Sequence, residues 1–256
     1  MRKKEPDKQK IIYGRKPVKE ALEQGISFEK IWLQKGISSR FEAEIKRLAQ
    51  KRHIAIQHVP SIKLEKLTRQ KTHQGIAALS ALIPYYEVDD ILSDAYDKGE
   101  IPLFLICDGI TDVRNFGAIA RTAACKGVHA IIITQKGSVS INGEAMKTSA
   151  GALHRLPICK VRFLDETVRY LKQNGLQIVG ADIRTEKYVS EVDWSIPTAL
   201  IMGAEGGGIS PKLLQTIDTI AKIPIISDFD SYNVSVATGM ILYESMQQRI
   251  KSELSA

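Results

Sequence analysis

The pattern of apolar and polar positions changes its period repeatedly along the chain, and each change marks a predicted element. Alternating or wholly apolar short runs are typical of strands, whereas apolar residues that recur every three or four positions are typical of helices. In the first third of the chain the pattern predicts helices and strands in turn, over residues 11–25, 28–36, 38–53, 54–59, 61–69 and 73–83. The helix over 38–53 is the clearest, because Phe41, Ile45 and Leu48 recur at helical spacing behind serines that can cap it.

A second part with a more regular alternation begins near residue 99. Strands are predicted over 102–108, 129–134, 176–182, 198–203 and 221–226, and helices over 115–127, 165–175, 210–217 and 233–250. Apolar strands that alternate with helices indicate a mostly parallel sheet covered on both faces. The sequence therefore predicts the α/β class throughout, with a small domain followed by a larger one.

The domain organisation follows from these patterns. Residues 1–10 are polar and charged, which predicts a disordered basic tail. The small domain is predicted over 11–84 and the larger one over 99–256. The acidic segment 85–98 between them is interpreted as a linker, with at most a short helix over 88–97.

Composition excludes several classes of protein. Of the 256 residues 44% are hydrophobic, but no run is long enough to span a bilayer, and no apolar stretch follows the charged N-terminus as in a signal peptide. Cys107, Cys125 and Cys159 are widely separated and odd in number, which excludes a disulfide framework and a thiolate zinc cluster. We therefore expect a cytoplasmic protein with no membrane partner and no bound metal.

The charge is divided unevenly along the chain. Residues 1–84 carry a net charge of +11, whereas residues 85–256 carry −4. Such asymmetry suggests a polyanionic partner, either nucleic acid or a membrane surface. From charge alone, a solubilising basic surface with a lysine-rich tail explains it equally well.

Three loops that follow apolar strands of the larger domain carry polar residues. Asn115 and Arg121 follow the first of these strands, Glu205 lies among four glycines after another, and Ser231 and Asn233 precede the last helix. Ligands gather at the carboxyl ends of strands in open α/β sheets, so these loops are candidate sites.

Taken singly, each loop also has an ordinary structural interpretation. Asn115, Ser231 and Asn233 can be helix caps, and the glycine-rich loop matches neither a Walker motif nor a dinucleotide fingerprint. Asp228 and Asp230 lack accompanying metal ligands at a suitable spacing, which favours a solvated loop.

The order and contents of the three loops together are far more specific. NFGAIAR at 115–121, MGAEGGGIS at 202–210 and IPIISDFDSYNVSVATG at 223–239 resemble the three motifs of the SpoU (TrmH-type) RNA 2′-O-ribose methyltransferases of the SPOUT superfamily. The segments IIYGRKPVKEAL and HQGIAA resemble the start and end of the small RNA-binding domain of the rRNA-modifying branch, which is similar to ribosomal protein L30e. The resemblance covers roughly residues 11–250.

This resemblance implies a fold, a cofactor and a set of site residues. It implies an L30e-like domain followed by a SPOUT domain with a C-terminal trefoil knot that binds S-adenosyl-L-methionine, in a homodimer. The cofactor-binding positions, mostly backbone, fall on Gly203, Ile223, Ile225, Tyr232, Val234 and Ser235. The catalytic positions fall on Asn115, Arg121, Glu205, Ser231 and Asn233. Two positions depart from the family's usual residues, Ser227 in place of glycine and Tyr232 in place of leucine.

The implied reaction transfers a methyl group in line to a ribose 2′-oxygen. Asn115 and Asn233 would position the reactants, and Glu205 would bind a hydroxyl or hold Arg121. A guanidinium normally stays protonated, so we interpret Arg121 as an electrostatic aid, with a carboxylate, a water or a phosphate oxygen accepting the proton.

The implied partner is RNA, and the branch with this N-terminal domain points to a guanosine of 23S rRNA. The alternatives are a tRNA 2′-O-methyltransferase of the same family, and a catalytically silent RNA-binding or ribosome-assembly protein on the same fold. The presence of Asn115, Arg121 and Glu205 disfavours the silent protein.

Overall fold

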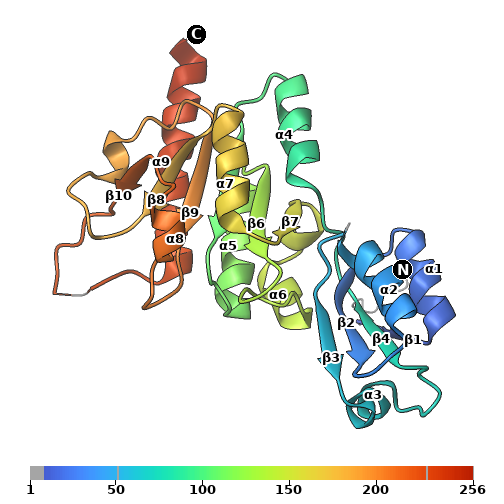
Figure 1. Ribbon diagram of the computed structural model, residues 1–256. Helices are drawn as coiled ribbons and strands as arrows, with labels where there is room; N and C mark the ends of the chain where they lie inside the picture. Colours follow the sequence, from blue (N-terminus) through green and yellow to red (C-terminus); the bar gives the residue numbers. More distant parts are fainter. Residues whose placement is uncertain (1–8, 51, 229, 256) are drawn as a thin grey trace, which may run out of the picture. The chain divides into compact units, whose positions relative to one another are not determined.

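The computed structural model describes residues 9–50, 52–228 and 230–255, which fall into two compact units (Figure 1). The first unit extends to Pro84 and includes residues 140–143, and the second comprises the rest of the chain from Tyr85. The tail predicted over residues 1–10 lies almost entirely outside the described residues.

The first unit is a small mixed sheet with helices on both faces. Its strands are β1 (Ile11–Tyr13), β2 (Phe28–Gln34), β3 (Ile56–Val59) and β4 (Ile76–Ser80), and its helices are α1 (Arg15–Glu23), α2 (Ser39–Gln50) and α3 (Ser61–Thr68). The strand order is β1-β4-β2-β3, with β2 and β3 parallel and the other pairs antiparallel.

Alternation along β2 explains why this unit has two apolar cores. Ile31 and Leu33 pack in the core that includes Leu22 of α1 and Ile45 of α2, whereas Trp32 packs in a second core with Leu64 of α3. Successive side chains of a strand point to opposite faces of the sheet. Because residues 31–33 of β2 are all apolar, helices must cover both faces of the sheet here.

The second unit is a six-stranded sheet between two layers of helices. Its strands are β5 (Leu103–Cys107), β6 (Ala130–Thr134), β7 (Ile158–Val161), β8 (Gln177–Ala181), β9 (Thr198–Met202) and β10 (Thr219–Ala221). Its helices are α4 (Val88–Asp97), α5 (Val113–Cys125), α6 (Gly143–Thr148), α7 (Leu164–Gln173), α8 (Pro211–Leu214) and α9 (Val234–Ser255), with short 3-10 turns at Ala152–His154 and Val189–Glu191.

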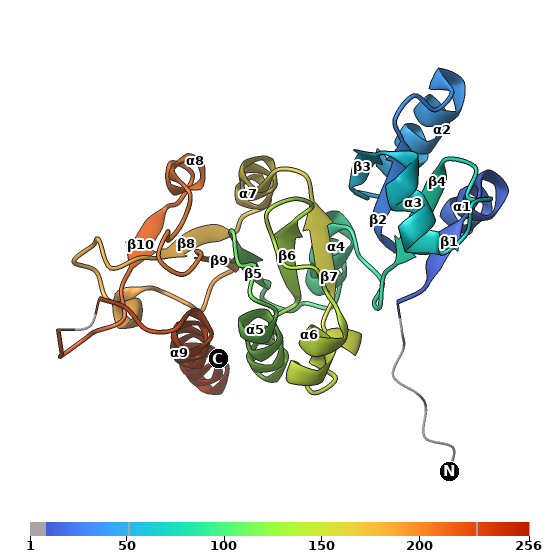
Figure 2. The same ribbon diagram turned by 90° about the horizontal axis from the view of Figure 1, so that it is seen from below.

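The six strands are all parallel, in the order β10-β8-β9-β5-β6-β7. Helices α4, α7 and α8 cover one face, and α5, α6 and α9 cover the other (Figure 2). This arrangement confirms the predicted parallel sheet covered on both faces. The trefoil knot that the resemblance implies stays a prediction.

The segment 85–98, interpreted from the sequence as a linker, belongs to the fold of the second unit. It contains helix α4, whose Val88 and Leu92 are buried in the main core beside Phe104 of β5 and Val168 of α7. The acidic residues that suggested a linker occupy the solvated side of an amphipathic helix, which is the ordinary place for them.

The strand predicted over 221–226 is wrong in its position. Strand β10 pairs with β8 through Thr219–Ala221, and residues 223–226 are outside any strand. Pro224 has no N–H to donate to a ladder, and the apolar residues around it, Ile223 and Ile225, line a cavity instead. Strand β7 and helix α6 were not predicted at all.

Two of the three cysteines, Cys107 and Cys159, are buried in the sheet and have unreactive thiols. Burial raises the pKa of the Cys107 thiol to about 12, and burial with nearby carboxylates raises that of Cys159 to about 12. A thiol with such a pKa is protonated at neutral pH and is a poor nucleophile. Cys125 is exposed on α5.

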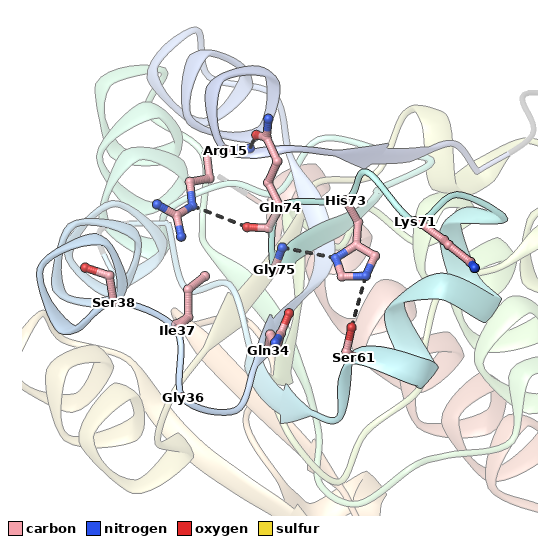
Figure 3. Close-up of a pocket in the computed structure, with 10 residues that line it drawn as sticks. All are labelled: Arg15, Gln34, Gly36, Ile37, Ser38, Ser61, Lys71, His73, Gln74 and Gly75. Carbon is pink, nitrogen blue, oxygen red and sulfur yellow. Dashed lines mark hydrogen bonds between the residues drawn. The ribbon is translucent and has the colours of Figure 1, made fainter.

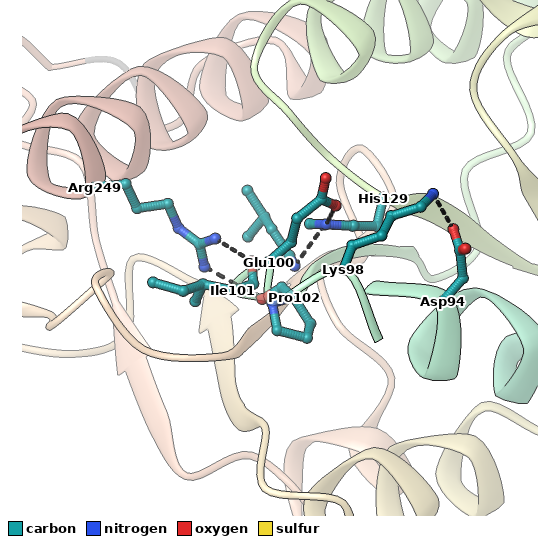
Figure 4. A network of polar contacts seen from close by, with 8 residues as sticks. Asp94, Lys98, Glu100, Ile101, Pro102, His129 and Arg249 are labelled. Carbon is teal, nitrogen blue, oxygen red and sulfur yellow. Dashed lines mark hydrogen bonds and ion pairs between the residues drawn. The ribbon is translucent and has the colours of Figure 1, made fainter. Parts of the chain in front are cut away.

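A half-buried arginine connects the last helix to the sheet (Figure 4). The guanidinium of Arg249 on α9 donates to the carbonyl oxygens of Trp194, Ile101, Pro102 and Ile196, at 2.9, 2.6, 3.2 and 3.1 Å. Burial lowers its pKa to about 10, so the group stays charged at neutral pH. Four carbonyl dipoles replace its hydration, which holds α9 against the segments that enter β5 and β9.

Within the described ranges, the helices are too short or too polar to cross a bilayer.

Candidate active site

Three polar side chains from distant parts of the chain meet in one hydrogen-bonded cluster. The Asn115 amide donates to Glu205 Oε1 at 3.0 Å, and the Asn233 amide donates to the same oxygen at 2.7 Å and to Asn115 Oδ1 at 3.1 Å. We call these three residues the amide–carboxylate cluster. It joins all three polar loops that the sequence singled out.

The topology of the sheet explains why these residues meet. Strands β5 and β9 are neighbours, with Cys107 opposite Met202 at their carboxyl ends. The loop after β5 leads into α5 with Asn115, and the loop after β9 carries Glu205. Helices α5 and α9 pack together on one face of the sheet, so the start of α9 places Asn233 at the same edge.

Local capping sets the positions of both asparagines. Asp112 is the N-cap of α5, and its Oδ1 accepts the backbone N–H groups of Arg114 and Asn115 at 2.9 and 2.8 Å. Asn233 precedes α9, and its Oδ1 accepts the backbone N–H and hydroxyl of Ser235 at 3.0 and 2.6 Å. The sequence suggested Asn115 as a cap, but the cap is Asp112, which leaves the Asn115 side chain for the cluster.

The glycine-rich loop after β9 folds back on itself very tightly. Ala204 and Gly208 exchange two backbone hydrogen bonds, at 3.1 and 2.9 Å, and Gly206 and Gly208 have φ of +77° and +65°. A Cβ on Gly203 would lie only 2.1 Å from the backbone carbon of Gly208. Asp108 at the end of β5 accepts the Ser210 N–H at 2.7 Å and so fixes the far end of the loop.

A cavity of about 550 Å³ lies beside the amide–carboxylate cluster. Five of the six predicted cofactor positions line it, namely Gly203, Ile223, Ile225, Tyr232 and Val234. Glu205 and Ser231 line it as well. Ser235, the sixth, contacts Asn233 as described above. The Tyr232 hydroxyl donates to the Pro224 carbonyl at 3.2 Å, which links the two segments that form this wall.

Charged residues that the sequence reasoning missed also line the cavity. Asp182 and Arg184 follow β8 and form a two-bond ion pair, with nitrogen–oxygen distances of 2.9 and 2.6 Å. The Arg184 guanidinium holds the pKa of Asp182 below its usual range. Lys222 lies after β10 and pairs with Glu186 at 3.2 Å. The same signal, a polar residue directly after an apolar strand, could have identified Asp182.

Arg121 is the one predicted catalytic residue that lies neither in this cluster nor in the cavity wall formed by the described residues. It lies six residues after Asn115 on α5, about 9 Å further along the helix axis and about 120° around it. It is exposed and outside the cavity wall formed by the described residues.

The residues that line the cavity suit an organic ligand rather than a metal ion. Among the described residues, no three His, Cys, Asp or Glu side chains come close enough together to hold a metal ion. The lining combines exposed backbone of the glycine loop, isoleucine side chains and a few charges of both signs. Such a wall suits a small molecule with an apolar part and charged ends.

Two family models match the chain. The SpoU rRNA Methylase family model matches residues 102–243, and the model for RNA 2′-O ribose methyltransferase substrate binding matches residues 11–86. These matches correspond to the second and the first unit.

Individual relatives and solved structures agree with these matches. YacO of Bacillus subtilis (strain 168), assigned to the TrmH family of tRNA/rRNA methyltransferases, is 33% identical over 238 residues, which cover 93% of this chain and 95% of the relative. The SpoU methyltransferase AviRb from Streptomyces viridochromogenes, solved in complex with AdoMet, aligns with a TM-score of 0.61 and 22% identity over 95% of this chain and 91% of that one.

The A. aeolicus TrmH/SpoU tRNA modifying enzyme aligns over 65% of this chain and 86% of its own, with a TM-score of 0.56 and 30% identity. The family models together span both units, and the relatives cover nearly the whole chain. This chain is therefore a member of the SpoU family of RNA methyltransferases.

Proposed function

We propose that the protein transfers a methyl group from S-adenosylmethionine to the ribose 2′-oxygen of a guanosine in 23S rRNA. The observation that carries this proposal is the amide–carboxylate cluster of Asn115, Glu205 and Asn233 at the edge of the 550 Å³ cavity. It supplies polar groups that can hold a hydroxyl beside a site for a small molecule.

The residues around the cavity suit S-adenosylmethionine. The tight glycine loop presents backbone groups without side chains, and Ile223 and Ile225 offer apolar surface for an adenine ring. Arg184 and Lys222 can meet a carboxylate, and Asp182 can meet an ammonium group. A volume of about 550 Å³ is typical of sites for ligands of this size.

The cluster itself can hold the ribose hydroxyl. When bound, S-adenosylmethionine supplies a methyl group that is activated by its sulfonium charge. Glu205 Oε1 accepts both asparagine amides, so Oε2 can accept the 2′-hydroxyl and its proton. The asparagines keep the carboxylate in one orientation, which lowers the cost of alignment. We assign Arg121 to a phosphate of the RNA or to developing negative charge, because a guanidinium does not release its proton.

The division of charge supports RNA as the partner of the first unit. Residues 1–84 carry a net +11, and most of them match the substrate-binding model. Lys and Arg side chains that neutralise phosphates release counterions and supply affinity without reading sequence. The chemistry and the affinity are thus assigned to different units.

The target is tested with purified protein and labelled S-adenosylmethionine. We expect methyl incorporation into 23S rRNA that lacks the modification, and a single stop of reverse transcription at a guanosine when nucleotides are scarce. Incorporation into tRNA alone would assign the protein to the tRNA-modifying enzymes of the family. No incorporation into either RNA would favour a silent RNA-binding protein.

Binding of S-adenosylmethionine is expected to need no metal. Backbone groups and charged side chains line the cavity, so a chelator should leave the affinity for S-adenosylmethionine unchanged. Calorimetric titration with S-adenosylmethionine and with its demethylated product, with and without the chelator, measures this. Absence of heat at ligand concentrations near a millimolar would contradict the assignment of the cavity.

We also propose that the protein is a homodimer that pairs through α9. Five apolar side chains are exposed on one stripe of this helix, at steps of three, four or seven positions, namely Val236, Met240, Tyr243, Ile250 and Leu254. An exposed apolar stripe of this length marks an interaction surface, and self-complementary stripes pair about a twofold axis.

Light scattering during size exclusion is expected to give twice the chain mass of 28.4 kDa. Tyr243→Glu should produce a monomer, because it places a carboxylate at the centre of an apolar interface. Ile62→Glu, at an exposed apolar position of the first unit, is the matched control and should leave the dimer intact. A dimeric Tyr243→Glu protein would place the interface elsewhere.

A further inference from the structure

The first unit contains a hollow of its own, with a volume of about 690 Å³ (Figure 3). It is bounded by the turn after β2 at residues 34–38, the loop before β4 at residues 71–75, Arg15 and Ser61. We call it the N-terminal pocket. It is larger than a phosphate ion needs and is of the size that small organic ligands occupy.

The chemistry of the lining favours an anion with a polar ring attached. Each lining residue is either neutral or basic, and Arg15 and Lys71 provide the two positive charges. Gln34 and Gln74 contribute side-chain amides, which both donate and accept hydrogen bonds. Ile37 adds an apolar surface. Phosphate, ribose and base present the matching groups.

Arg15 is held in place before any ligand arrives. Its Nε donates to the Gln74 carbonyl at 3.3 Å, and its backbone N–H donates to Gln74 Oε1 at 2.9 Å. The guanidinium carbon lies 4.8 Å from the centre of the Phe41 ring, within range of a cation–π interaction. The terminal Nη groups remain available, so binding an anion costs little side-chain entropy.

The loop on the opposite side is equally constrained. His73 is 4% exposed, and its Nδ1 accepts the Gly75 N–H at 3.0 Å. Its Nε2 therefore carries the proton of the neutral ring and faces Ser61 Oγ at 3.4 Å. Ser61 Oγ in turn donates to Glu65 at 3.4 Å. Gln74 has φ of +53°, a conformation that a non-glycine residue adopts only when its surroundings impose it.

Two helices add a favourable field at the rim. Arg15 and Ser61 are the first residues of α1 and α3, whose N-cap residues Gly14 and Pro60 form no side-chain cap; at α1 the Gln74 side chain accepts the first N–H. Their first backbone N–H groups carry partial positive charge, which adds to that of Arg15 and Lys71.

We propose that the N-terminal pocket binds one unpaired nucleotide of the substrate RNA. Its phosphate would lie between Arg15 and Lys71, and its base edge would meet the amides of Gln34 and Gln74. The nucleotide must be unpaired, because a base inside an A-form helix cannot enter a hollow that is lined on several sides. This inference rests on the proposed function only in taking RNA as the ligand.

The test uses the full-length protein and two fluorescent probes, a 12-nucleotide single strand of mixed sequence and a 12-base-pair blunt RNA duplex. Lys71→Ala and Gln34→Glu are expected to weaken single-strand binding by about 5-fold or more, through a lost phosphate contact and a carboxylate placed near a phosphate. The matched controls are Lys66→Ala and Gln50→Glu, which make the same changes at exposed helical positions outside the pocket lining. They should change single-strand affinity by less than about 2-fold.

Binding of the duplex separates a nucleotide site from general basic charge. Lys71→Ala and Lys66→Ala should affect duplex affinity equally, and Gln34→Glu should match Gln50→Glu. If each pocket variant also bound the single strand with the same affinity as its control, the pocket would not be a nucleotide site. Lys71 is exposed, so its removal leaves the core intact, and unchanged S-adenosylmethionine binding verifies the second unit. Pocket-dependent single-strand binding without methylation of any RNA would overturn the proposed function and leave this inference standing.

Discussion

Gly203→Ala is expected to weaken S-adenosylmethionine binding by at least about 10²-fold, because the loop would have to move by more than 1 Å. The added Cβ would lie 2.1 Å from the Gly208 carbon, 2.3 Å from the Ile209 nitrogen and 2.4 Å from the Gly208 oxygen. All three are backbone atoms, so a side-chain rotation cannot relieve the overlap. The paired bonds between Ala204 and Gly208 must open, and the wall of the cavity opens with them. Calorimetric titration measures the loss.

Gly207→Ala is the matched control for this substitution. Gly207 belongs to the same loop and lines the same cavity, but a Cβ there would meet nothing within 4 Å, and its φ is not positive. The affinity of the Gly207→Ala variant for S-adenosylmethionine should stay within a few-fold of that of the unmodified protein. Circular dichroism and thermal unfolding show whether each variant keeps its sheet. Ordinary affinity in Gly203→Ala would show that the loop tolerates opening and that the cavity wall lies elsewhere.

Arg121→Ala is expected to lower the single-turnover rate of methylation by about 10²-fold or more, the loss typical of one electrostatic contributor. Affinity for S-adenosylmethionine should be retained, because Arg121 lies outside the cavity wall that the described residues form. The fold should survive as well, since the side chain is exposed. Rates and affinities are measured separately, with labelled S-adenosylmethionine and an rRNA fragment.

Arg169→Ala removes the same charge from an exposed position of α7 and should leave the rate within about 2-fold. A wild-type rate in Arg121→Ala would make this residue an ordinary surface arginine. The amide–carboxylate cluster would then account for the chemistry without it.

The elements of the chain were largely predictable because their causes are local. The apolar runs that became β5, β6, β8 and β9 are buried except at some strand ends, and each was visible in the sequence. Helices α8 and α9 begin at Pro211 and Val234, each one residue after the start of its predicted range, 210–217 and 233–250. The short helix that the sequence allowed over 88–97 is α4, but its place in the core of the second unit was not predicted, because its buried face is only a few residues wide.

The candidate residues could be found in the sequence, but their arrangement could not. Asn115 and Glu205 follow apolar strands, and a parallel sheet brings the carboxyl ends of its strands to one edge, whereas Asn233 is placed there by the start of α9. Which of these ends are neighbours depends on the strand order, which places β9 between β8 and β5. Only that order brings Asp182 and Arg184 to the same cavity as Glu205.

Local sequence therefore specified periodicity, caps and turns, since these depend on residues a few positions apart. The tertiary structure decided which side chains meet. It made residues 223–226 part of a cavity wall rather than a strand. It also joined Asn115, Glu205 and Asn233 in one hydrogen-bonded cluster. Each of these outcomes depends on contacts between residues far apart in the chain, which no local pattern encodes.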